Sequence, residues 1–117
     1  MSMNAGGRTA EIDAAEAIAR TASGAWLLDV RESDEWEAGH SAAAHFLPMS
    51  QLQARVEEVP SDVPVLVICR SGGRSAAVTN ALRQAGYDAT NVAGGMQGWR
   101  AAGGDVLRSD GAPGDVI

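Results

Sequence analysis

The stretch from Val65 to Ser75, VLVICRSGGRS, decides the fold of this 117-residue chain. Its first four residues are aliphatic and do not alternate with polar residues, which is typical of a central parallel strand that is covered on both faces. Cys69 ends this strand, and a polar loop with two adjacent glycines follows. A helix begins at about Arg74. This passage from a buried strand through a glycine-rich turn into a helix is typical of α/β proteins.

Strands and helices alternate on both sides of this stretch, which predicts a mostly parallel sheet of five strands in a three-layer α/β/α domain. Asp13 and Glu16 have capping-box spacing, as do Ser50 and Gln53, and both pairs predict a helix start. The expected strands cover residues 9–12, 26–30, 45–47, 65–68 and 89–92. The expected helices run from 14 to 22, from a cap at Ser33 to Gly39, from Ser50 onward, from Arg74 to Ala85 with Gly86 after it, and through a turn that ends near Trp99.

The length predicts one domain, since a domain commonly holds roughly 100–150 residues. We expect the folded domain to cover residues 8–107. The ends at 1–7 and 108–117 are expected to be flexible, with a frayed chain from Gly103 onward, because both are rich in small and polar residues.

Composition disfavours several classes of function. The chain has 9 basic residues, all arginine, against 15 acidic ones, for a net charge of −6. An acidic chain lacks the basic patch that attracts nucleic acids and anionic membranes. A chain without lysine cannot form a Schiff base with a substrate. It has no run of about 18 apolar residues that could span a membrane, and its first ten residues lack the apolar core of a secretory signal.

Cys69 is the single cysteine of the chain, so no internal disulfide can form. This cysteine usage indicates a reducing, cytoplasmic setting. One cysteine and two histidines, His40 and His45, give no zinc-binding spacing, and we expect no metal. We interpret His40 as the donor or acceptor of a structural hydrogen bond and the three tryptophans as packing residues.

The loop after Cys69 has the features of an anion-binding site. Gly72 and Gly73 can adopt the positive φ angles that turn successive backbone N–H groups inward, and the next helix points its N-terminus at the same place. Arg70 and Arg74 add positive charge. A thiol in such a place has a lowered pKa. It also follows the carboxyl end of a strand, where open α/β sheets bind their ligands.

This segment allows two other interpretations. A lone cysteine after four aliphatic residues is more often a small core residue, but the glycine pair and the two arginines favour a reactive thiol here. The turn could instead be a nucleotide-binding phosphate loop. It lacks the GxxxxGK[ST] pattern and its lysine, so that interpretation is disfavoured.

The sequence resembles the single-domain rhodanese (thiosulfate sulfurtransferase) family over roughly residues 8–104. The resemblance rests on LLDVRESDEWEAGH at 27–40, a partial match at 44–48, CRSGGRS at 69–75 and NVAGGMQGW at 91–99. One segment departs from the family pattern. Where the family usually reads GHIPGA, this chain reads GHSAAA at 39–44, so that alanines replace a Pro-Gly turn.

The resemblance implies a rhodanese-like fold and a sulfurtransferase that works without a cofactor. Cys69 would attack the outer sulfur of thiosulfate or a similar small anionic donor and hold it as a persulfide, which cyanide or a thiol then removes. Asp29 and Arg31 match positions that we interpret as structural. The loop that would bind the persulfide and the donor consists of Arg70, Ser71, Gly72, Gly73, Arg74 and Ser75, with the two arginines on the anionic donor.

Loop length separates this family from related phosphatases. From Cys69 to Arg74 the spacing is C-x4-R, whereas the related dual-specificity phosphatases have one residue more and room for a phosphate. A persulfide carrier that exchanges sulfur with a donor or acceptor protein remains an alternative. A non-catalytic interaction or sensor module is a second alternative, and a phosphatase or arsenate reductase is a more distant one. We expect a monomer.

Overall fold

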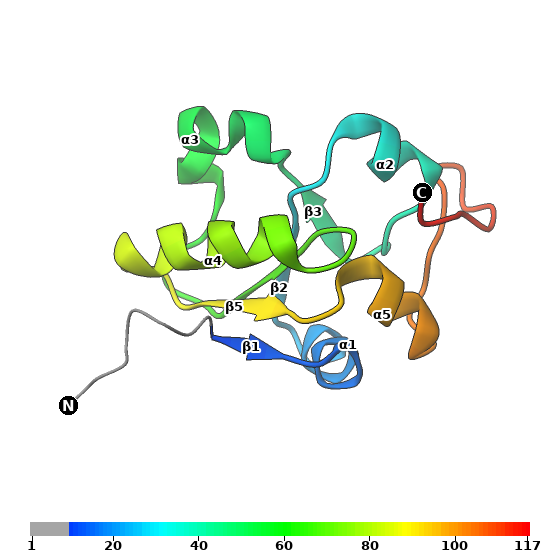
Figure 1. The fold of residues 1–117 in the computed structure, drawn as a ribbon, viewed down its shortest axis with the longest axis horizontal. Helices are drawn as coiled ribbons and strands as arrows, with labels where there is room; N and C mark the ends of the chain where they lie inside the picture. Colours follow the sequence, from blue (N-terminus) through cyan, green and yellow to red (C-terminus); the bar gives the residue numbers. More distant parts are fainter. Residues whose placement is uncertain (1–9) are drawn as a thin grey trace.

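The computed structural model describes residues 10–117 as one sheet with helices on both faces (Figure 1). All neighbouring strands in the sheet are parallel, in the order β1-β5-β4-β2-β3. The predicted central position of residues 65–68 is therefore confirmed. The strands are β1 (Glu11–Ile12), β2 (Trp26–Asp29), β3 (Ala44–Phe46), β4 (Val65–Ile68) and β5 (Ala89–Val92).

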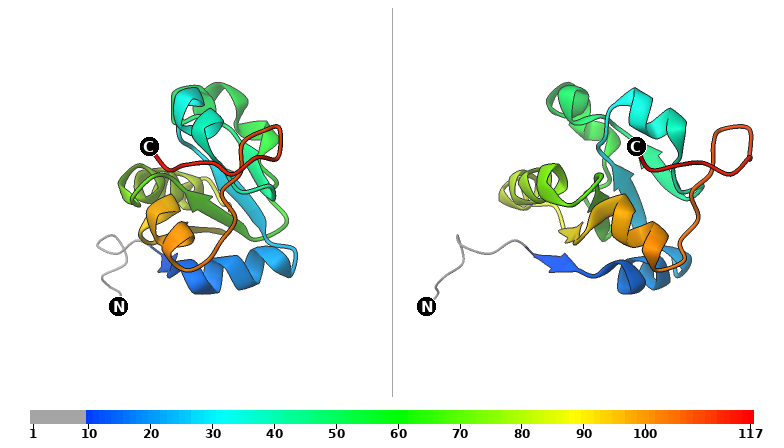
Figure 2. Two further views of the ribbon diagram at one scale, coloured as in Figure 1. Left: turned by 90° about the vertical axis from the view of Figure 1, so that its right-hand side faces the viewer. Right: turned by 45° about the vertical axis from the view of Figure 1, so that its right-hand side comes forward.

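Two groups of helices cover the two faces of the sheet, which confirms the predicted three-layer α/β/α architecture. One apolar cluster lies on the side of α3 and α4, and another on the side of α1 and α5. Figure 2 shows α1 and α5 together on one side of the sheet. The helices are α1 (Ala14–Ala22), α2 (Ser33–Ala38), α3 (Leu52–Arg55), α4 (Gly73–Gln84) and α5 (Gly95–Ala101).

The central strand β4 shows why its sequence does not alternate. Val65 and Val67 belong to the cluster under α3 and α4, whereas Leu66 and Ile68 belong to the cluster under α1 and α5. All four are at most 1% exposed. Because successive side chains of a strand point to opposite faces, Cys69 follows Val65 and Val67 onto the side of α4.

Two of the helix boundaries agree with the sequence prediction. The carboxylate of Asp13 caps α1 by accepting a hydrogen bond from the Glu16 amide at 2.9 Å. Gly86 follows the end of α4 with a φ of +96°, a left-handed conformation that glycine adopts without a steric penalty.

Two other helix starts differ from the prediction. Helix α2 is capped by Glu32, which forms a capping box with Glu35, and Ser33 is its first residue. The predicted capping box at Ser50 and Gln53 is wrong, because 3-10 turns at Met49–Gln51 and Val56–Glu58 flank the short α3. The Ser50 hydroxyl instead donates to Glu32 at 2.9 Å, so a contact between distant segments replaces the local one.

The segment after α5 is held against the domain, in contrast to the frayed end expected from Gly103 and the flexible end expected at 108–117. Leu107 forms an antiparallel bridge with His40, and the Asp115 amide donates to the Ala38 carbonyl at 2.8 Å. Figures 1 and 2 show the segment running from α5 to α2. The glycines of this segment do not make it flexible, because they allow its backbone to approach the rest of the domain closely. A Cβ on Gly114 would lie 2.7 Å from the Ala38 carbonyl oxygen.

Some expectations lie outside the described residues. These are the flexible end at 1–7, the start of the predicted domain at residue 8, and the first residue of the strand predicted over 9–12. Within residues 10–117, no helix is both long enough and apolar enough to cross a membrane.

Candidate active site

Cys69 lies at the carboxyl end of β4, with its sulfur surrounded by hydrogen-bond donors. The Sγ accepts from the Gly72 amide at 3.2 Å, from the Ser75 amide at 3.4 Å and from the Ser75 hydroxyl at 3.2 Å. Cys69 is 1% exposed and Ser75 is 0% exposed, so water cannot take the place of the Ser75 hydroxyl at the sulfur. The loop is therefore built to hold negative charge on the sulfur of Cys69.

The pKa of Cys69 reflects two opposing effects. Burial raises it, because the thiolate loses solvation, while the Ser75 hydroxyl and the backbone amides of Ser75, Gly72 and Ser71 lower it. Together the hydrogen bonds outweigh burial, so the pKa lies below the usual thiol value. The thiol is therefore more nucleophilic at neutral pH than a buried core cysteine, because the thiolate is the reactive form.

The two loop glycines have different roles. Gly72 adopts a φ of +111° and precedes α4, which turns its amide toward the sulfur. Gly73 does not adopt the positive φ that its residue type would allow, because it is already the first residue of α4. The amide direction in this loop thus depends on one left-handed residue, and the helix supplies the following amides.

Helix α5 binds the backbone of the loop that follows β4. The amides of Met96 and Gln97 donate to the carbonyls of Cys69 and Arg70, at 2.7 and 3.1 Å. A Cβ on Gly95 would lie 2.4 Å from the Cys69 carbonyl oxygen, so only glycine permits this close approach. Asn91 of β5 donates to the Gly72 carbonyl at 3.3 Å. The segment at 91–99 therefore holds the backbone of the loop in place.

Arg74 points toward α2 and pairs with Glu35. Its two terminal nitrogens, Nη1 and Nη2, each donate to one carboxylate oxygen of Glu35, both at 2.7 Å. This bidentate hydrogen bonding is the main reason that the pKa of Glu35 is lowered and that of Arg74 is raised. The pair links α2 to the start of α4.

Arg70 extends along the exposed side of the loop. Its Nε donates to the main-chain oxygen of Ile117 at 2.8 Å. The segment after α5 thus reaches the rim of the loop, although its sequence gave no reason to expect a contact there.

The DVR residues are structural, as interpreted from the sequence. Asp29 and Arg31 are both fully buried, and Arg31 donates to Asp29 from its backbone and from its guanidinium, at 2.7 to 3.1 Å. Arg31 also donates to the Gly39 carbonyl at 2.8 Å. His40 stacks on Trp36 and its Nδ1 lies 2.7 Å from the Trp36 carbonyl oxygen, so it has a structural contact too.

The predicted site residues are thus brought together only in part. The sulfur of Cys69 is surrounded by donors from Ser71, Gly72 and Ser75. The side chains of Arg70 and Arg74 instead bind Ile117 and Glu35. Glu35 was not predicted as a site residue, although it lies within the segment at 27–40 that carries the family resemblance. Asn91 and Gly95 were not predicted to have a structural role either. No local signal distinguishes these residues, because their partners lie far away in the sequence.

Comparison with known proteins agrees with this geometry. Residues 13–102 match the family model described as "Rhodanese-like domain". The chain belongs to this family, as the sequence motifs predicted.

Two of three similar relatives carry sulfurtransferase names. The chain is 36% identical over 74 residues to the putative sulfurtransferase YtwF of Bacillus subtilis, covering 63% of this chain and 72% of the relative. It is 33% identical over 75 residues to the thiosulfate sulfurtransferase GlpE of Tolumonas auensis, covering 63% and 71%. It is 40% identical over 76 residues to the uncharacterized protein YqhL of Bacillus subtilis, where the match spans 64% of this chain and only 60% of the relative.

Solved structures show the same fold. A rhodanese-related protein from Thermoplasma volcanium superposes with a TM-score of 0.78 at 34% identity, covering 84% of this chain and 97% of the other. A thiosulfate sulfurtransferase from Pseudomonas aeruginosa gives a TM-score of 0.74 at 33% identity, covering 85% of this chain but only 20% of that protein. These matches confirm the predicted α/β fold.

Proposed function

We propose that the protein is a sulfurtransferase. It moves sulfane sulfur from thiosulfate or a similar donor to a thiophilic acceptor, cyanide or a thiol, through a persulfide on Cys69. The observation that carries this proposal is the set of donors from Gly72 and Ser75 around the Cys69 sulfur. Membership of the rhodanese-like family and the sulfurtransferase names of its relatives support it.

The proposed reaction has two steps. The Cys69 thiolate attacks the outer sulfur of thiosulfate, the S–S bond of thiosulfate breaks, and sulfite leaves with the electron pair of that bond. Cyanide then attacks the outer sulfur of the persulfide, thiocyanate leaves, and the Cys69 thiolate returns. Because negative charge moves from the inner to the outer sulfur and back, fixed amide donors at this place suit both steps.

Intact-mass spectrometry tests the proposal directly. After incubation with thiosulfate, the protein should gain the mass of one sulfur atom, and a cyanide chase should remove it. Cys69→Ser should keep the fold, as judged by circular dichroism, and gain no sulfur. Sulfur transfer by that variant at the parent rate would contradict the proposal.

Phosphatase activity is an alternative that an aryl phosphate assay on the same protein tests. The short spacing from Cys69 to Arg74 brings the loop amides close to the sulfur, and a tetrahedral phosphate needs more room. We expect little or no hydrolysis of an aryl phosphate by protein that transfers sulfur readily. Hydrolysis as fast as sulfur transfer would favour the phosphatase interpretation.

A further inference from the structure

Both guanidinium groups of the loop already have partners on the protein. Arg74 is held by both carboxylate oxygens of Glu35, at 2.7 Å each, and Arg70 donates through its Nε to the Ile117 main-chain oxygen. A bidentate carboxylate takes up two of the N–H groups that a guanidinium would offer to an oxyanion. An anionic donor therefore meets one arginine, Arg74, whose charge a carboxylate compensates, and another, Arg70, that is engaged through one N–H group only.

The compensation at Arg74 is strong because Glu35 is sheltered from water. The Glu35 side chain is 13% exposed and that of Arg74 is 37% exposed, so solvent ions screen this pair less than a surface pair. The hydrogen bonds from Arg74 also lower the pKa of Glu35, which keeps its carboxylate ionised at neutral pH. The two charges cancel in the neighbourhood of the Cys69 sulfur.

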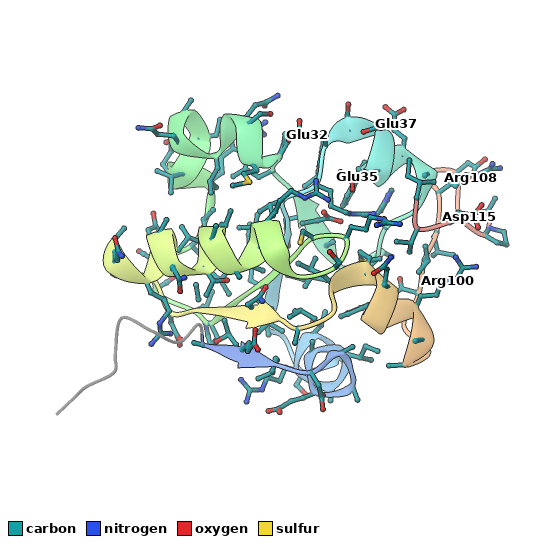
Figure 3. The ribbon with its side chains drawn as sticks, in the orientation of Figure 1. Glu32, Glu35, Glu37, Arg100, Arg108 and Asp115 are labelled. Atoms are coloured by element: carbon teal, nitrogen blue, oxygen red, sulfur yellow. The ribbon has the colours of Figure 1, made fainter. Side chains whose placement is uncertain are left out.

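The helix that carries Glu35 is acidic. Helix α2 and its cap hold four carboxylates within residues 32–37 and no basic residue. In Figure 3, Glu35 lies on the side of α2 that faces the loop, while Glu37 lies on the outer side. Since Coulomb energy scales with the charge of the approaching molecule, this environment repels a dianion about twice as strongly as a monoanion.

We propose that Glu35 determines which sulfur donors the site accepts, by cancelling the charge of Arg74 and thereby favouring donors of charge −1 or 0 over dianions. The chemical class that fits is the persulfide of a thiol, RSSH. This inference rests on the proposed sulfurtransferase function and narrows its substrate class. In the loading step the Cys69 thiolate attacks the outer sulfur of RSSH, the S–S bond of the donor breaks, and RS⁻ leaves with its electron pair. The proton stays on the transferred sulfur.

Two matched donors can measure this preference. Thiosulfate and methanethiosulfonate both deliver their outer sulfur from a sulfonyl-type sulfur, but the first is a dianion and the second a monoanion. The measurement is the rate at which Cys69 gains one sulfur atom, followed by intact mass in single-turnover conditions. The quantity of interest is the ratio of the thiosulfate rate constant to the methanethiosulfonate rate constant.

Glu35→Gln should raise this ratio. Removing one negative charge near the sulfur should speed loading about threefold for the monoanion and about ninefold for the dianion, since the electrostatic energy doubles with donor charge. Glutamine keeps the capping role of residue 35, because both Glu and Gln serve at that position of a capping box. Glu37→Gln is the matched control, with the same charge change on the same helix at an exposed position that solvent screens, and should raise the ratio much less than Glu35→Gln.

The outcomes separate the two proposals. If neither donor loads Cys69 of the parent protein, the proposed sulfurtransferase function fails. If both donors load but Glu35→Gln leaves the ratio at the parent value, or Glu37→Gln raises it equally, the role of Glu35 is overturned and the function stands. Ionic strength offers a test without a variant. Added salt should raise the parent ratio by screening repulsion, and a fall with salt would overturn the inference.

Discussion

At the scale of single residues, Ser75 contributes twice to the environment of Cys69. Its amide and its hydroxyl both donate to the sulfur, and its side chain is shielded from water. The amide contribution is fixed by the backbone, but the hydroxyl contribution can be removed. The two contributions can therefore be separated by one substitution.

Ser75→Ala should raise the pKa of Cys69, because a hydrogen bond that stabilises the thiolate is lost and the protonated form is favoured. The pH dependence of alkylation by iodoacetamide measures this, and its midpoint should move to higher pH. Ser61→Ala, at an exposed turn position, should leave the midpoint in place. An unmoved midpoint in Ser75→Ala would assign the lowered pKa to the amides alone.

The buried pair of Asp29 and Arg31 predicts a large effect on stability. In Asp29→Asn the Arg31 charge stays buried without its counter-ion, so the free energy of unfolding should fall by roughly 3–5 kcal/mol. Urea denaturation at neutral pH measures this. The exposed pair of Arg20 and Glu16 is the control, and Glu16→Gln should cost less than about 1 kcal/mol. Equal losses in the two variants would contradict the structural role given to Asp29.

At the scale of elements, the start of α5 and the loop after β4 form one unit. The amides of Met96 and Gln97 satisfy two carbonyls of the loop that β4 and α4 leave unpaired. This contact requires that the first residue of α5 has no side chain, because the backbones of Gly95 and Cys69 meet there. The position of α5 thus affects the direction of the loop amides around the sulfur.

Gly95→Ala should therefore impair both stability and sulfur loading. The new Cβ would lie 2.4 Å from the Cys69 carbonyl oxygen and 2.6 Å from the Arg70 carbonyl, so one backbone must move. We expect a loss of more than about 2 kcal/mol in unfolding free energy, and slower gain of sulfur by Cys69.

Gly103→Ala is the matched control for this substitution. Gly103 also has a positive φ, at +91°, but a Cβ there meets nothing within 4 Å. Its cost should be limited to backbone strain of about 1 kcal/mol, with sulfur loading unchanged. If the two variants lose the same stability and load sulfur alike, close packing of α5 on the loop is not what requires Gly95.

The turn in which alanines replace the usual Pro-Gly pair of the family is fixed by a distant residue. Asp105 accepts from the Ser41 hydroxyl at 2.9 Å and from the Ala42 amide at 2.8 Å. A carboxylate from the segment after α5 thus replaces a turn-forming sequence. This arrangement joins the entrance of β3 to the last segment of the chain.

At the scale of the whole molecule, that last segment forms part of the domain. Trp99 donates from its Nε1 to the Asp105 carbonyl at 3.0 Å, and a Cβ on Gly104 would lie 2.3 Å from the same indole nitrogen. Together with the bridge between Leu107 and His40, these contacts link α5, α2 and the turn before β3.

Asp105→Ala should loosen this link. Two hydrogen bonds to a charged acceptor are lost at a largely exposed site, so the free energy of unfolding should fall by about 1–2 kcal/mol. Limited proteolysis should then cut the segment after α5 faster than in the parent protein. Asp62→Ala removes an exposed carboxylate elsewhere, and should change neither the free energy of unfolding nor the rate of proteolysis. Unchanged proteolysis in Asp105→Ala would mean that this carboxylate does not hold the segment.

The sequence predicts those features that depend on neighbouring residues. The aliphatic run at 65–68 indicated the central strand, Asp13 indicated the start of α1, and Gly72 indicated the turn at the sulfur. Contacts between distant segments were not predictable. Nothing in the local sequence around Glu35 says that Arg74 will lie opposite, and a Gly- and Asp-rich segment at 103–117 looks like a loose end unless its contacts with Ala38 and His40 are known.

The order of the strands also constrains how this chain can fold. The central strand β4 needs β2, made before it, and β5, made after it, while β1 pairs with β5 alone. During synthesis β1 leaves the ribosome well before its neighbour, and it can pair only once residues 89–92 have emerged. A growing chain that stops short of that point leaves one edge of β4 open to other chains. Because these pairings are distant in sequence, we expect folding of the sheet to be slow and to wait until residues 89–92 have left the ribosome.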